Sequence, residues 1–75
     1  MMNSQFVAER AKEVSERLAE QEKDETRRVE RAYRLVLGRK PAAEETAEGR
    51  EIVAKLGWTS FCRVLLASNE FIYVD

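Results

Sequence analysis

The chain begins with a stretch in which apolar residues recur at intervals of four, three and four positions. These residues are Val7, Ala11, Val14 and Leu18. Such spacing places them on one face of an amphipathic helix, with charged residues around the rest. Because Asn3 or Ser4 can accept a hydrogen bond from a free amide of the first turn, we predict a helix over residues 4–22.

The apolar pattern stops between Glu20 and Arg28 and then starts again. Asp24 can cap a new helix, so we predict a break near this residue and a second helix over residues 24–37. Gly38 is expected to end that helix, because glycine adopts the left-handed conformation without steric cost. The predicted apolar face consists of Val29, Ala32, Tyr33, Val36 and Leu37, with Leu35 alongside.

A third helix is predicted over residues 43–56, after Pro41 and before Gly57. Its apolar face is thin, with Ala47, Ile52, Val53 and Leu56 at spaced positions. It also contains Gly49, and a glycine inside a helix costs about 1 kcal/mol relative to alanine. This helix is therefore expected to be the least stable of the set.

The fourth predicted helix covers residues 59–68, with Thr59 or Ser60 as its cap. It carries the strongest apolar face of the chain, formed by Trp58, Phe61, Cys62, Leu65 and Leu66. Asn69 tolerates the left-handed conformation and is expected to close this helix. Residues 69–75 would then form an apolar C-terminal tail.

These elements together predict an all-α fold, a small bundle of three to four short helices in one module over residues 1–75. A domain of this length buries only about 60% of the surface that its unfolded chain exposes. The single cysteine excludes a disulfide within the chain. We therefore expect a protein partner to complete the burial of apolar surface, either a second copy or the remainder of a larger parent domain.

The apolar faces also predict which side chains meet that partner. They are Val7, Val14, Leu18, Trp58, Phe61, Leu65, Phe71 and Tyr73. Burial of apolar area, at about 25 cal/mol per Å², would drive the contact. A homo-oligomer in solution is one expected form of it.

Charged residues make up 36% of the chain, but both signs are interspersed and the net charge is −1. This balance predicts no general attraction to nucleic acid or to an anionic membrane. One local exception is the second predicted helix, where Arg27, Arg31 and Arg34 share a face. These arginines support an alternative function, a small helical DNA-binding regulator, although Glu30 is expected to pair with Arg34.

Residues that carry chemistry are scarce. The chain has no histidine, so the usual general base near neutral pH is missing. Cys62 falls on an apolar face and is interpreted as a small core residue. Glu44 and Glu48 lie four positions apart, which is interpreted as a solvated helix face instead of a metal site. The sequence thus predicts a protein that is not an enzyme and has no catalytic, cofactor-binding or metal-binding residues.

The apolar runs, such as residues 64–67, are far too short to span a bilayer. The N-terminus lacks the basic start and apolar core of a signal peptide. From this chain alone we predict a cytoplasmic location.

Three segments, in order along the chain, resemble one protein family. They are Met2–Val7, then Tyr33–Arg39 with Pro41, Glu44 and Glu45, and finally Leu65–Asp75. They are similar to the C-terminal part of the planctomycete domain of unknown function 1553, a large domain that accompanies cytochrome-c-like domains. A second family, an extracellular repeat domain of unknown function, is similar only over Tyr33–Arg39.

The resemblance implies a detached C-terminal part of a longer protein that has no established activity. Full-length relatives often look exported, in contrast to the cytoplasmic location predicted from this chain. The Cys-x-x-Cys-His motif of their haem-binding partner domains is absent here, so no haem is expected. Family members usually have a threonine cap followed by proline where this chain has Ala42 and Ala43, and the lost cap costs about 1 kcal/mol.

Overall fold

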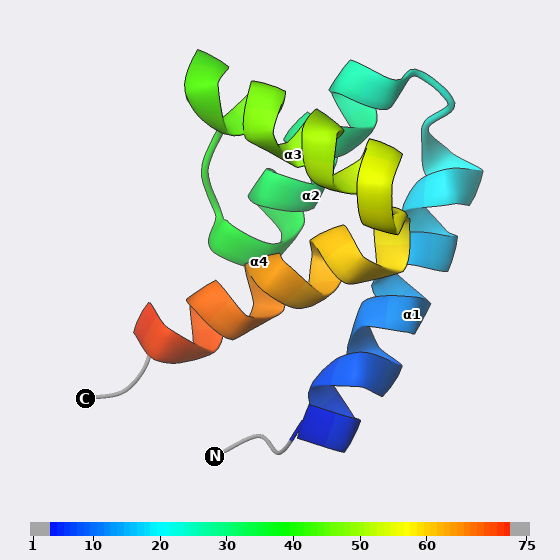
Figure 1. The fold of residues 1–75 in the computed structure, drawn as a ribbon, viewed down its shortest axis with the longest axis vertical. Coiled ribbons are helices and arrows are strands. Elements are labelled where there is room, and N and C mark those ends of the chain that lie inside the picture. Colours follow the sequence, from blue (N-terminus) through cyan, green and yellow to red (C-terminus); the bar gives the residue numbers. More distant parts are fainter. Residues whose placement is uncertain (1–3, 73–75) are drawn as a thin grey trace.

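The computed structural model describes the backbone of residues 4–72 and the side chains of residues 5–68. In this range the chain forms α1 (Ser4–Gln21), α2 (Glu25–Leu37), α3 (Ala43–Leu56) and α4 (Trp58–Ile72), and it contains no strand (Figure 1). The predicted all-α class is confirmed. α4 contacts each of the other three helices and packs most extensively on α1, whereas α1 and α2 share the smallest interface.

The predicted break between the first two helices is confirmed, and Asp24 caps α2. The Asp24 carboxylate accepts a hydrogen bond of 3.0 Å from the Arg27 backbone N–H. The Arg28 guanidinium reaches back across the turn and donates to the Glu22 carbonyl oxygen at 2.8 Å. Ser4 is the first residue of α1, and Asn3 lies outside the described residues.

In the connection from α2 to α3, the side chain of Glu45 takes over the role of the missing N-cap of α3. Gly38 ends α2 in the left-handed conformation (φ 70°), as predicted. Ala42 offers no side-chain cap, but the Glu45 carboxylate accepts the Ala42 backbone N–H at 2.9 Å. The Arg39 guanidinium donates to both oxygens of Glu45 at 2.7 Å, which ties the connection to the first turn of α3. These hydrogen bonds, first from Arg39 and then from Ala42, lower the pKa of Glu45 to about 2.

Both predicted ends of the last helix are wrong. α4 begins at Trp58, ahead of Thr59 and Ser60, and its first turn is closed by the Phe61 N–H donating to the Gly57 carbonyl oxygen at 3.2 Å. The helix also continues past Asn69 to Ile72, because neither glycine nor proline follows to stop it. Residues 69–72 are therefore helical instead of a tail, and residues 73–75 lie outside the described range.

The core is assembled from all the helices except α3, which covers it. Its buried apolar residues are Val7, Ala11, Val14, Leu18, Val29, Ala32, Tyr33, Phe61, Cys62, Leu65 and Leu66. Val36, Leu37, Ile52, Val53 and Trp58 pack against this cluster and are partly buried.

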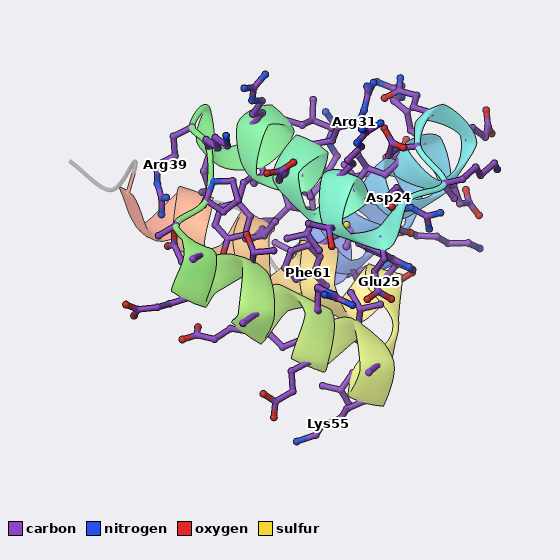
Figure 2. The ribbon with its side chains drawn as sticks, turned by 90° about the horizontal axis from the view of Figure 1, so that it is seen from above. Asp24, Glu25, Arg31, Arg39, Lys55 and Phe61 are labelled. Carbon is purple, nitrogen blue, oxygen red and sulfur yellow. The ribbon has the colours of Figure 1, made fainter. Side chains whose placement is uncertain are left out.

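Phe61 lies at the centre of the packing between helices, between α2 and α3 in Figure 2. Its ring is 1% exposed and lies 6.2 Å from the Tyr33 ring and 5.9 Å from the Trp58 ring, measured between centroids. Gly49 of α3 faces this ring. A β-carbon at Gly49 would stand 2.9 Å from Phe61 Cε1 and 3.2 Å from Val29 Cγ1. The glycine that appeared to weaken α3 therefore allows α3 to approach the core.

We predict that Gly49→Ala destabilises the protein, although alanine is the better helix former. The gain in helix propensity is about 1 kcal/mol. Overpacking a core costs about 1–3 kcal/mol, and the upper part of that range applies because Phe61 cannot turn away between Tyr33 and Trp58. Urea unfolding should show a net loss of about 1–2 kcal/mol. The exposed neighbour Glu48→Ala is the control, and a gain in stability for Gly49→Ala would contradict the packing.

We also predict that Glu45 makes stability depend on pH. Its pKa is lowered on folding from the ordinary 4.5 to about 2, so its contribution is fully present above 4.5 and is lost as the pH falls through 2. The difference in melting temperature between wild type and Glu45→Gln should be constant near neutral pH and should disappear in acid. Glu44→Gln, which removes an exposed carboxylate of the same turn, is the control. A difference as large at pH 2 as at neutral pH would contradict this role.

Candidate functional site

Five of the side chains predicted to meet a partner are instead buried by the chain's own helices. Val7, Val14, Leu18, Phe61 and Leu65 are at most 7% exposed. These five side chains are not exposed in the folded chain, because α4 packs against every other helix and the apolar faces cover one another.

The remaining three predicted contact residues differ in position. Trp58 is partly buried against the core, and the Arg28 guanidinium lies over its ring at 4.7 Å from the centroid. The side chain of Phe71 and the whole of Tyr73 lie outside the described residues. Trp58 therefore serves to join α4 to the start of α2.

A different set of large apolar side chains remains exposed. They are Phe6 (50%), Leu35 (52%), Leu56 (68%) and Val64 (47%). Leu35 lines an open groove of about 440 Å³ between α1 and α2. The other lining residues are Leu18, Gln21, Arg31 and Arg34.

The sequence pattern predicts Leu35 only as a neighbour of the apolar face, although Arg27, Arg31 and Leu35 follow one another at helical spacing on the outer face.

The three predicted arginines do lie together, beside this groove. Arg27, Arg31 and Arg34 line a polar depression of about 240 Å³, which also contains Glu22, Glu30 and Lys40. The two hollows share Arg31 and Arg34, so the apolar groove continues into the basic depression. Figure 2 shows Arg31 on the side of α2 that faces away from Phe61.

These arginines are only loosely held. Arg31 Nε lies 3.5 Å from Glu22 Oε1, a longer separation than in the other ion pairs of the described residues. The side chains of Arg27 and Arg34 form no ion pair or hydrogen bond with the part of the chain that the structure describes, and the expected pair of Arg34 with Glu30 is not formed there. Both guanidinium groups are therefore available to a ligand.

Two further arginines of the same region have internal roles. Arg28 joins α2 to the Glu22 carbonyl and to the Trp58 ring. Arg39 lies over the Tyr33 ring at 5.5 Å and holds Glu45 by two hydrogen bonds. The basic surface is therefore narrower than the arginine content of α2 suggests.

Cys62 has the environment of a core residue. It is 0% exposed, and burial raises the pKa of its thiol to about 11. The group is therefore protonated at neutral pH, whereas a nucleophilic cysteine has to be a thiolate.

The buried hydroxyl of Ser15 takes part in two hydrogen bonds. It donates to the Lys12 carbonyl oxygen at 2.9 Å, so the 3.1 Å contact with Thr59 Oγ1 is a hydrogen bond donated by Thr59. Thr59, expected to cap α4, thus joins α4 to α1. Among the described side chains, no buried nitrogen or oxygen lacks a partner.

The described residues contain no group of three histidine, cysteine, aspartate or glutamate side chains placed to hold a metal ion. None of the described helices combines the length and the apolar character that crossing a membrane requires.

The fold and this surface define a small all-α module whose outer α2 face combines an apolar groove with arginines. Residues 1–53 match the family PSD1, described as a protein of unknown function (DUF1553), and the chain belongs to this family. The match includes the first two segments that carried the resemblance and ends before Leu65–Asp75. No curated protein and no solved structure matches the chain.

We predict that Cys62 is inert in the folded protein. Relative to an ordinary thiol with a pKa of 9.0, a pKa of about 11 lowers the thiolate fraction at neutral pH on the order of a hundredfold, and burial excludes the reagent as well. Labelling with Ellman's reagent should therefore proceed only as the protein opens, and should become rapid in concentrated urea. Rapid labelling without denaturant would contradict the buried position.

Proposed function

We propose that this chain is a non-catalytic helical module that binds another protein. The observation that carries the proposal is the half-exposed Leu35, which lines a groove together with Arg31 and Arg34. Complete burial of a leucine side chain contributes about 1.5–3 kcal/mol, so a partner that covers Leu35 gains binding energy there. The contact surface is thus the outer face of α2 instead of the apolar stripes.

The residues available for chemistry support a non-enzymatic role. The chain has no histidine, and its one thiol is neutral in the core. Glu44, Glu48 and Glu51 lie exposed on α3, and Lys55 pairs with Glu51 at 2.8 Å, as expected for a solvated helix face.

The nature of the partner follows from the family resemblance. Longer planctomycete-type proteins of this family, associated with cytochrome-c-like domains, would place this module against the rest of the parent domain. A second copy of the chain is the other candidate partner. The chain lacks a haem-attachment motif, so haem binding is not part of the proposal. The cytoplasmic location stays a prediction, which cell fractionation can test.

DNA binding is the alternative function, and one observation favours it. Arg27 and Arg34 are not neutralised by any described carboxylate, and the depression that they line holds four cationic and two anionic side chains. Binding to phosphate would weaken steeply with added salt, whereas contacts that bury Leu35 would not.

The proposal predicts association that can be measured with the intact chain. Sedimentation velocity over a range of protein concentrations tests for a second copy. Titration of the ¹⁵N-labelled chain with the polypeptide that precedes the matching region in a longer family member tests for the parent domain. Either measurement should reveal a complex. A monomer at every concentration, together with unchanged amide resonances in the titration, would contradict the proposed function.

A further inference from the structure

The groove between α1 and α2 places apolar and basic groups side by side. Resting on the proposed function, we infer that this groove binds an acidic amphipathic helix of a partner protein. An apolar side chain of that helix packs on Leu35 above the buried Leu18, and its carboxylates meet Arg27, Arg31 and Arg34. The proposed function names only a protein partner, whereas this inference states the chemistry of the segment that binds.

The apolar part of the groove has the form of a receptor for one helix face. Leu18 is 1% exposed and forms the floor, while Leu35 is 52% exposed and forms one wall. Helix-in-groove recognition uses such hollows to receive apolar anchors spaced by three or four residues.

The charged part of the surface determines which charge the partner must carry. Four cationic side chains and two carboxylates line the adjoining depression, although the chain as a whole carries a net charge of −1. The positive surface is therefore local, and charge complementarity favours an acidic ligand. Arg31 is held to Glu22 only at 3.5 Å, so a partner carboxylate can replace that contact with a shorter bidentate one.

An acidic helix accounts for both parts of the surface at once. An amphipathic helix carries its apolar and charged side chains on neighbouring stripes, which matches a groove that runs into a basic depression. A nucleic-acid backbone would satisfy the arginines but would leave Leu35 without an apolar partner. For this reason we favour a protein helix over DNA as the occupant.

The experiment uses a designed peptide as the probe. The peptide is a helix with leucines at helical spacing and glutamates on the flanking positions, and its counterpart has lysine in place of every glutamate. Fluorescence anisotropy gives the affinities, and amide shifts of the ¹⁵N-labelled chain locate the contact. The acidic peptide should bind at the groove residues of α1 and α2, and the basic peptide should not.

Matched variants separate the groove from the rest of the surface. Leu35→Ser and Arg34→Glu should each weaken binding of the acidic peptide by about tenfold or more, a loss of about 1.4 kcal/mol. Leu56→Ser and Arg63→Glu change exposed residues elsewhere and should leave the affinity unchanged. Circular dichroism melts confirm that each variant is folded.

Three results would overturn the inference. Binding that survives Leu35→Ser would show that the peptide uses another surface, while the proposed function would stand. Absence of peptide binding, together with self-association that Leu35→Ser abolishes, would assign the groove to a second copy. Salt-sensitive binding of labelled duplex DNA that is lost in Arg34→Glu and kept in Leu35→Ser would assign the arginines to nucleic acid.

Discussion

The contact between the Phe61 ring and the bare backbone of Gly49 determines how closely the helices of this protein pack. Tyr33 of α2 and Trp58 of α4 hold the ring on two sides, and α3 closes the third side only because Gly49 has no side chain. The distance that a β-carbon would have from Phe61, 2.9 Å, leaves no room even for alanine. With α3 seated in this way, a chain of 75 residues can close its own core.

Because the core is closed, the surface that we propose for partner binding lies at a place that the apolar pattern does not indicate. Val29 and Tyr33 anchor the inner face of α2 in the core, and the outer face of the same helix presents Arg31 and Leu35. The outer face is therefore carried by a helix whose position is fixed by packing. Because α1 and α2 share the smallest interface of the fold, a groove remains between them, and its floor is the buried Leu18.

Periodicity and local capping chemistry were sufficient to predict the all-α fold, the break before Asp24 and the end of α2 at Gly38. They failed at Asn69, because its tolerance for the left-handed conformation is weak compared with the continued helix. Gly49 was interpreted as a cost, since a sequence shows the propensity of a residue and not the ring that packs on it. For the same reason the apolar stripes were assigned to a partner: their spacing shows that each must be covered, but not that they cover one another.

The arginines show most clearly what the sequence alone cannot predict, since identical side chains in one short segment have separate roles. Arg28 and Arg39 lie over aromatic rings and donate to Glu22 and Glu45, so their charges are used to join helices. Arg27 and Arg34 differ from Arg28 of the same helix only in the direction in which α2 projects them, outward and beside Leu35. Spacing in the sequence predicts a shared face, but only the packing of α2 decides which face is buried. The surface that results combines positive charge with exposed apolar area on a slightly acidic molecule, and a ligand that is acidic and apolar at once satisfies both.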